Sequence, residues 1–304
     1  MGPSTTRDEP RYLELHRAGR LAALARRLEE SLRACRLCPR RCGVNRQAGE
    51  RGRCGEGTVP RIAAAYPHFG EEPCLVGRGG SGTVFFSGCG LGCRFCQNDA
   101  IRRGEEGIGK DPAALADLFL ALQEAGCENL NLVTPTHQVA GWVRALDLAA
   151  ARGLRIPLVY NTGGYEEAWV VEALEGVVDL WLPDWKTRDP DRARRWMDAP
   201  DYPQVVAEAI GRMVRQSGVL QVDRDGVARR GVLVRHLVMP GAADDARDCL
   251  EAIAALAPGM AVSLMDQYRP VARDPGDPVL LRRPGRLEQE AAVEAIRRLG
   301  LRRC

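Results

Sequence analysis

The chain has 304 residues, of which 45% are apolar and 27% are charged, a balance typical of a soluble folded protein. Its 43 basic and 40 acidic residues leave a net charge of +3, so charge gives no argument for a nucleic-acid or membrane partner. No apolar run reaches the roughly 18 residues of a membrane-spanning helix, and the N-terminal sequence has no apolar core of a signal peptide. We therefore expect a cytoplasmic protein.

An N-terminal helix is predicted over residues 10–33, because leucines recur there at helical spacing and form one apolar stripe. The leucines of this stripe are Leu13, Leu21, Leu24, Leu28 and Leu32. The next segment, 35–57, holds four cysteines, several arginines and few apolar side chains, so it needs something other than a hydrophobic core to order it. The sequence therefore predicts three parts. They are an N-terminal helix (1–34), a four-cysteine module (35–60) and a main domain (61–304).

From about residue 80, short apolar runs alternate with amphipathic stretches, which predicts βαβ units and a parallel sheet. The predicted strands are 83–87, 130–134, 156–161, 177–182, 231–238 and 260–265. The predicted helices are 111–126, 138–152, 165–175, 190–217, 243–256 and 287–299. Six such units fit a partial (β/α)6 barrel, and an open doubly wound sheet is the alternative. In both folds the chemistry lies at the C-terminal ends of the strands.

Cysteine is the most informative residue type in the chain. Eight of the 11 cysteines lie between Cys35 and Cys96. A secreted disulfide scaffold would be shorter and would spread its cysteines, so this clustering favours metal or iron–sulfur ligation. The isolated Cys127, Cys249 and Cys304 are expected to be buried thiols or, at the terminus, a spare thiol. Cys74 is expected to be buried and is not predicted to be a ligand.

Three cysteines, Cys89, Cys93 and Cys96, follow the first predicted strand with C-x3-C-x2-C spacing. A zinc site or simple electron-transfer cluster normally has four protein ligands, whereas three ligands leave one metal position open for a substrate or cofactor. The count therefore favours a catalytic site. The alternative is a zinc ion whose fourth ligand is His68, His137 or Cys74.

This loop, with aromatic Phe95 before its last cysteine, resembles the CxxxCxΦC signature of radical S-adenosylmethionine (radical SAM) enzymes. More narrowly, several segments resemble the branch related to pyruvate formate-lyase activating enzymes, often called PflX-like. These segments are 70–98, 159–166, 182–186, 230–241 and 265–270. The resemblance extends over about residues 35–270 and implies an α/β fold, the partial (β/α)6 barrel of the radical SAM type.

The resemblance also implies an oxidoreductase chemistry. Cys89, Cys93 and Cys96 would hold a [4Fe–4S] cluster whose fourth iron binds the amino and carboxylate groups of S-adenosylmethionine. Reduction would cleave this cofactor to methionine and a 5′-deoxyadenosyl radical that abstracts hydrogen. The branch implies glycyl-radical activation of a partner enzyme, and another protein, peptide or small-molecule substrate stays open. A reducing partner such as flavodoxin or ferredoxin is expected to supply the electron.

Polar residues at the ends of the second and third predicted strands are candidate cofactor-binding residues, together with Phe95. Thr134 and Thr136 occupy the place where the family often has a GGEP-type loop for the cofactor's amino group, a pattern from which this sequence departs. Asn161 and Thr162 are candidates for the ribose or methionine part. Ordinary turn residues are an equal interpretation of Asn161 and Thr162, because Asn-Thr-Gly-Gly is turn chemistry.

Charged residues at the ends of the last strands complete the candidate site. Asp184-x-Lys186 resembles the D-x-K segment of the activating-enzyme branch, where such residues face cofactor or substrate; a solvated surface ion pair is the alternative. Arg235 lies in an otherwise apolar strand and needs a partner charge, for which the cofactor carboxylate is a candidate. Lys186 and Arg235 are the predicted catalytic residues, and Asp184 is predicted to bind the cofactor.

The N-terminal set Cys35, Cys38, Cys42 and Cys54 is a complete group of four thiols. Its spacing suits either an auxiliary iron–sulfur cluster or a zinc site. Two other classes of protein therefore compete with the enzyme. A two-cluster electron carrier would use four plus four cysteines, whereas this chain offers four plus three. A zinc-stapled nucleic-acid binder is opposed by the balanced overall charge and the lack of clustered aromatic residues.

Overall fold

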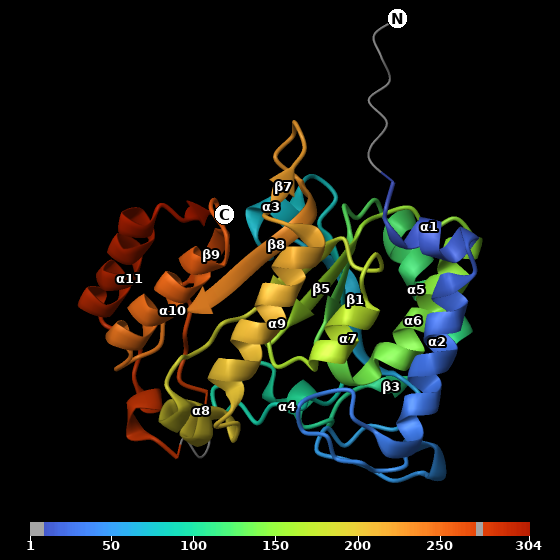
Figure 1. Cartoon of the computed structure of the whole chain (residues 1–304), viewed down its shortest axis with the longest axis horizontal. Helices are drawn as coiled ribbons and strands as arrows, with labels where there is room; N and C mark the ends of the chain where they lie inside the picture. The colour runs from blue at the N-terminus through green and yellow to red at the C-terminus, as the bar shows by residue number, and fades with distance from the viewer. Residues whose placement is uncertain (1–8, 272–275) are drawn as a thin grey trace, which may run out of the picture.

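A computed structural model of the chain describes residues 9–271 and 276–304. Helices pack around one sheet with the strand order β10-β9-β8-β6-β5-β4-β2-β1-β3, and β7 pairs with β8 (Figure 1). The strands are β1 (Arg61–His68), β2 (Ser81–Phe86), β3 (Ile108–Gly109), β4 (Leu130–Val133), β5 (Leu158–Thr162), β6 (Leu180–Pro183), β7 (Gln221–Val222), β8 (Ala228–Leu237), β9 (Ala261–Met265) and β10 (Arg302–Arg303).

None of the helices in the described part of the chain is long and apolar enough to cross a membrane. The α-helices are α1 (Tyr12–Arg17), α2 (Arg20–Ser31), α3 (Pro73–Val76), α4 (Asp99–Arg102), α5 (Pro112–Glu124), α6 (Val139–Ala151), α7 (Ala168–Ala173), α8 (Pro190–Met197), α9 (Tyr202–Ser217), α10 (Ala243–Leu256) and α11 (Arg286–Leu299). The 3-10 helices are η1 (Leu32–Ala34), η2 (Arg46–Ala48), η3 (Thr136–Gln138) and η4 (Pro278–Leu281).

Six parallel strands, β2, β4, β5, β6, β8 and β9, are neighbours in the order in which they occur in the chain. This order confirms the predicted α/β fold with six units, and it favours the partial barrel, because a doubly wound sheet reverses its strand order. Among the described residues the edge strands β3 and β10 do not pair with each other, so the sheet is open. The C-terminal ends of the parallel strands therefore meet at one end of the molecule.

Two predicted helices are each divided in two. The helix predicted over 10–33 is interrupted at Gly19, whose φ of 69° lies in the left-handed region that favours glycine. The helix predicted over 190–217 ends at Asp198, whose φ of 54° stops α8 before α9 begins. The α1–α2 pair packs on α6, with Leu13, Leu21 and Leu28 buried, as the apolar stripe predicts.

Backbone and arginine hydrogen bonds order the four-cysteine module of residues 35–60, here called the cysteine module. Its chain folds back on itself, because Cys35 N donates to Val44 O at 2.9 Å and Gly43 N donates to Cys35 O at 2.9 Å. Arg46, only 3% exposed, donates from Nη1 to His137 O at 2.6 Å and from Nη2 to Gly57 O. The module lies at the same end of the molecule as α4 and α8 (Figure 1).

The isolated cysteines have different environments. Cys127 and Cys249 are buried thiols, as predicted. Cys304 is not a spare terminal thiol, because it forms a disulfide with the buried Cys74, with a Cα–Cα distance of 6.6 Å. The two are 230 residues apart in sequence and meet because β10 adds to the edge of the sheet beside β9, near α3. Cys74 is therefore also excluded as a fourth ligand for a zinc ion at Cys89, Cys93 and Cys96.

Candidate functional site

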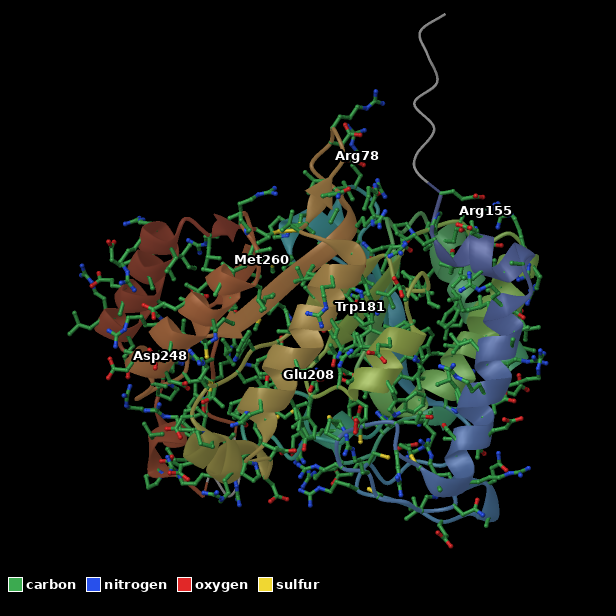
Figure 2. All side chains as sticks on the ribbon, in the orientation of Figure 1. Arg78, Arg155, Trp181, Glu208, Asp248 and Met260 are labelled. Carbon is green, nitrogen blue, oxygen red and sulfur yellow. A yellow bond between two sulfur atoms is a disulfide. The ribbon has the colours of Figure 1, made fainter. Side chains whose placement is uncertain are left out.

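A cavity of about 180 Å³ lies at the C-terminal ends of the parallel strands. Its wall includes Cys89, Cys93 and Cys96, here called the cysteine loop together with the residues between them. Figure 2 shows sulfur atoms gathered toward this end of the molecule, opposite the end at which Arg78 is labelled. Polar residues in or directly after four strands, β4, β5, β6 and β8, complete the wall. Those named by the sequence are Thr134, Thr136, Asn161, Thr162, Asp184, Lys186 and Arg235.

Phe95 does not line this cavity. Its side chain is 4% exposed and packs edge to face on Trp196, with ring centroids 6.3 Å apart. The Nζ atom of Lys186 lies 5.9 Å from the centroid of the Phe95 ring. Phe95 therefore packs the cysteine loop against α8 and lies beside the Lys186 ammonium group. It is not positioned to contact a ligand in the cavity directly.

Asp184 joins the two predicted catalytic cations. Its Oδ2 accepts a hydrogen bond from Lys186 Nζ at 2.6 Å, and its Oδ1 accepts one from Arg235 Nε at 2.7 Å. Burial alone would raise the pKa of Asp184, but the charges of Arg235 and Lys186 hold it below its ordinary value. The three side chains are no more than 16% exposed. The alternative of a solvated surface ion pair is therefore wrong.

Further polar groups fix the orientation of Arg235. Asn161 Oδ1 accepts from Arg235 Nη2 at 2.6 Å, and Nη1 lies 3.9 Å from carboxylate oxygens of Glu71 and Glu72. Burial raises the pKa of Glu71, and the charge of Arg235 acts in the opposite direction. The guanidinium is thus held between three carboxyl groups and an amide, and its position in the cavity wall is fixed before any ligand binds.

The threonines around the cavity converge on a carboxyl group that sequence analysis missed. Glu166, 3% exposed, accepts hydrogen bonds from Thr136 Oγ1 at 2.6 Å, from Thr162 Oγ1, and from Tyr160 Oη at 3.0 Å. The hydroxyl protons of both threonines are therefore used within the protein. Thr134 has a φ of 58°, which is unusual for a β-branched residue and marks a constrained turn at the cavity.

We expect Glu166→Gln to remove a pH dependence of stability. Burial raises the pKa of Glu166 to about 7 in the folded protein, from 4.5. Its contribution to stability is therefore full below pH 4.5 and is lost as the pH rises through 7. Between pH 5.5 and 8.5 the wild type should lose about 2 kcal/mol more unfolding free energy than Glu166→Gln. Urea unfolding of both proteins at the two pH values measures this difference, and equal losses would contradict it.

Burial and charge act in opposite directions on the thiols of the cysteine loop. Burial raises the pKa of Cys89 and of Cys93 to about 12, while the charge of Lys186 lowers both. Arg102, which lines the cavity, adds a second positive charge near Cys93. A metal at this loop would have to displace protons from the thiols, and the two cations would stabilise the resulting negative charge. Arg102, at the end of α4, lines the cavity, and Glu166 bonds to two threonines of the wall without lining it. Neither residue carried a sequence signal, because only the fold brings them there.

The cysteine module places its four sulfurs near one another. Burial raises the pKa of Cys38 to about 12, and the sulfurs of Cys54, Cys35 and Cys42 raise it through space. Cys38 also lines the cavity, whereas the other three module cysteines do not. The described residues contain no group of three or more His, Cys, Asp or Glu side chains arranged to hold a metal ion. Metal ligation at both cysteine sets therefore stays a prediction.

His137 is the one histidine among the proposed zinc ligands that lines the cavity. Its Nε2 bonds to Ser87 O at 2.6 Å, while its Nδ1 is buried and has no hydrogen-bond partner in the described part of the chain. Burial lowers its pKa to about 4, so the ring is neutral at physiological pH. His137, the alternative fourth zinc ligand, therefore lies in the cavity wall with an uncharged ring.

No protein-family model matches the chain. An uncharacterized protein of Methanocaldococcus jannaschii is 29% identical over 282 residues, which cover 88% of this chain and 75% of that protein.

Two solved structures are similar to parts of the chain. The radical S-adenosylmethionine methyltransferase TsrM from Kitasatospora setae is 15% identical over 62% of this chain, with a TM-score of 0.45. SuiB of Streptococcus suis, bound to S-adenosylmethionine, is 14% identical over 71%, with a TM-score of 0.48. The matches span 35% and 47% of those two proteins, so this chain covers less than half of their length.

Proposed function

We propose that the protein is a radical SAM enzyme. The observation that carries this proposal is the gathering of Cys89, Cys93 and Cys96 with the polar strand-end residues around one cavity. The spacing of these cysteines resembles the radical SAM signature, and three thiols leave a metal position open for a cofactor. Fixed cations and a buried carboxylate lie in the same wall. An electron carrier would need none of this lining.

In this proposal, Cys89, Cys93 and Cys96 would hold a [4Fe–4S] cluster. Leu91 N donates to Cys89 Sγ at 3.4 Å, and Asn98 donates a backbone hydrogen bond to Cys96. Hydrogen bonds of this kind tune iron–sulfur centres by stabilising thiolate sulfur. When bound, the cluster would supply the electron that cleaves S-adenosylmethionine to methionine and a 5′-deoxyadenosyl radical, which abstracts hydrogen from the substrate.

The residues of this chain would bind and orient the cofactor. Arg235 is held in place by Asp184 and Asn161 and is suited to a carboxylate, because its planar guanidinium donates in a fixed geometry. Lys186 lies between Asp184 and the cysteine loop and balances negative charge there. Of the three threonines in the wall, Thr134 is the one whose hydroxyl group does not donate a hydrogen bond to Glu166. Tyr165, 5% exposed, and Leu91 help to exclude water.

The substrate and partners belong to the same proposal. The activating-enzyme resemblance supports glycyl-radical activation of a partner enzyme, and modification of another protein or peptide fits the same chemistry. A flavodoxin or ferredoxin would deliver the electron. The four cysteines of the module would hold either a second iron–sulfur cluster or zinc. We expect the enzyme to act in the cytoplasm.

The test is anaerobic production of 5′-deoxyadenosine. The protein is reconstituted with iron and sulfide, reduced with photoreduced 5-deazaflavin, and mixed with S-adenosylmethionine. Wild type and Cys127→Ala, which removes a buried thiol outside the cavity, should produce 5′-deoxyadenosine. Cys93→Ala should lose at least about 100-fold, because one of three cluster ligands is gone.

A second measurement is needed if the wild-type protein cleaves S-adenosylmethionine only when its substrate is present. S-adenosylmethionine should change the electron paramagnetic resonance spectrum of the reduced cluster, because it binds the open iron. An unchanged spectrum together with no product would overturn the enzyme proposal in favour of an electron carrier. A protein that takes up zinc at Cys89, Cys93 and Cys96 would overturn it as well.

A further inference from the structure

Residues 134–138, here called the threonine turn, connect β4 to α6 and contribute three residues to the cavity wall. These residues are Thr134, Thr136 and His137. Thr134 has a φ of 58°, a left-handed conformation that is unfavourable for a β-branched side chain. A residue keeps such a conformation only where the surrounding structure holds it there. The contacts around the threonine turn therefore decide the shape of this part of the wall.

The main domain holds the first half of the threonine turn. Thr134 N donates to Asn161 O at 2.8 Å, so the end of β5 fixes the first residue. Trp142 Nε1, on α6, donates to Pro135 O at 3.1 Å and fixes the second. The second half of the turn is contacted by the cysteine module, which lies about 80–90 residues earlier in the chain.

Arg46 and Glu56 of the cysteine module bind this second half. Arg46 is 3% exposed, and its Nη1 donates to His137 O at 2.6 Å. Its Nη2 donates to Gly57 O and lies 3.4 Å from Gln138 Oε1. Glu56, 1% exposed, accepts from Gln138 Nε2 at 3.3 Å. Burial raises the pKa of Glu56, whereas the charge of Arg46 is among those that lower it, so the two opposite charges support each other.

Hydrogen bonds within the module fix the backbone that carries Arg46. This residue begins the 3-10 helix η2, whose N-terminal residue Asn45 accepts at Oδ1 from Ala48 N, at 3.1 Å. Asn45 N in turn donates to Glu50 Oε2 at 2.7 Å. The guanidinium is therefore presented to the threonine turn from an ordered segment of the module.

The module also packs closely on the segments that flank the turn in space. A Cβ at Gly141, in α6, would lie 2.2 Å from Pro60 Cγ. A Cβ at Gly88, directly before Cys89, would lie 2.6 Å from Glu56 Cγ, and Gly88 has a φ of 77°. Glycine is required at Gly88 for both reasons. Glu56 therefore contacts the start of the cysteine loop as well as the threonine turn.

We propose that Arg46 and Glu56 are positioning residues that hold the threonine turn in the conformation that binds S-adenosylmethionine. This inference rests on the proposed function, which assigns the cavity to that cofactor. Neither residue lines the cavity, so both act through the turn. Without the guanidinium, Thr134 is free to leave its left-handed conformation, and the wall loses its shape. The cysteine module is then part of the cofactor site, whether or not its thiols bind a metal.

The affinity of the full chain for S-adenosylmethionine tests this role. The reconstituted protein is kept unreduced, so that the cofactor binds without being cleaved, and equilibrium dialysis with radiolabelled S-adenosylmethionine measures the Kd. Arg46→Met, which has a long side chain without hydrogen-bond donors, should raise the Kd about tenfold or more. Arg46→Lys keeps the charge but makes fewer hydrogen bonds, and should raise it about threefold. Arg33→Met is the matched control, because Arg33 is exposed and bonds to Gln47 at 3.2 Å, and its Kd should be unchanged.

Cluster content and stability separate positioning from a general loss of structure. Arg46→Lys should keep the iron and sulfide content and the thermal unfolding midpoint of Arg33→Met while its Kd rises. If Arg46→Met does not hold its cluster, Arg46→Lys alone decides the test. A wild-type Kd in Arg46→Lys and Arg46→Met would overturn this inference and leave the proposed function standing. A wild type that binds no S-adenosylmethionine would overturn both.

A second substitution tests whether Arg46 acts through Thr134. Asparagine adopts the left-handed conformation more readily than threonine, so Thr134→Asn should need less restraint from the guanidinium. In the Thr134→Asn background, Arg46→Met should therefore raise the Kd about threefold or less, instead of about tenfold. The same factor in both backgrounds would overturn the claim that Arg46 acts through the threonine turn.

Discussion

Replacing Asp184 with alanine should lower the unfolding free energy by about 3–5 kcal/mol, because it leaves two buried cations without their shared carboxylate. Lys186 Nζ and Arg235 Nε both donate to this carboxylate, at 2.6 and 2.7 Å. In the variant, Arg235 keeps Asn161 and the more distant Glu71 and Glu72. Lys186 keeps no carboxylate at salt-bridge distance among the residues that the structure describes. Chemical denaturation at pH 7 measures the loss.

Two further variants test the physical cause. Adding Lys186→Met to Asp184→Ala should restore part of the lost stability, because one of the two unpaired charges is then removed. Asp184→Asn should cost less than Asp184→Ala, since the amide oxygen still accepts one hydrogen bond. A loss below about 1 kcal/mol in Asp184→Ala would show that solvent already screens both cations, as in an exposed ion pair.

The strand-end residues of the cavity could be predicted because parallel strands end at one edge of the sheet. The apolar runs predicted the six parallel strands, and polar residues in or just after several of these runs were then expected at a common site. Asn161, Asp184 and Arg235 are connected by hydrogen bonds for this reason. Phe95 was predicted to contact the cofactor, but its residue type equally suits the packing on Trp196 that the structure shows.

Other features depend on packing that a linear pattern does not contain. β1 was missed because Arg61–His68 mixes small, aromatic and proline residues without alternation. Its partner β2 is antiparallel to it, which the parallel pattern did not predict. Glu166 belongs to a loop, and only the fold brings it to Thr136 and Thr162. The close packing of Gly88, Gly90 and Gly92 against the cysteine module likewise depends on the fold.

The disulfide between Cys74 and Cys304 was the least predictable contact, because its cysteines are 230 residues apart. It joins α3, which lies between β1 and β2 in the chain, to the residue after β10 at the opposite edge of the open sheet. The bond therefore connects the two sides of the sheet that strand pairing leaves apart. A crosslink that closes so long a loop strongly reduces the conformational entropy of the unfolded chain.

Cys304→Ser should therefore lower the unfolding free energy by about 2–4 kcal/mol under oxidising conditions. Denaturation of both proteins with and without dithiothreitol measures this effect, and thiol titration of the unfolded, metal-free chains checks that the bond is present. With dithiothreitol the difference should vanish, because the wild type then also lacks the crosslink. Equal stability of the oxidised proteins would mean that strand pairing between β9 and β10 holds this edge without the crosslink. Production of 5′-deoxyadenosine should persist in Cys304→Ser, because neither Cys74 nor Cys304 lines the cavity.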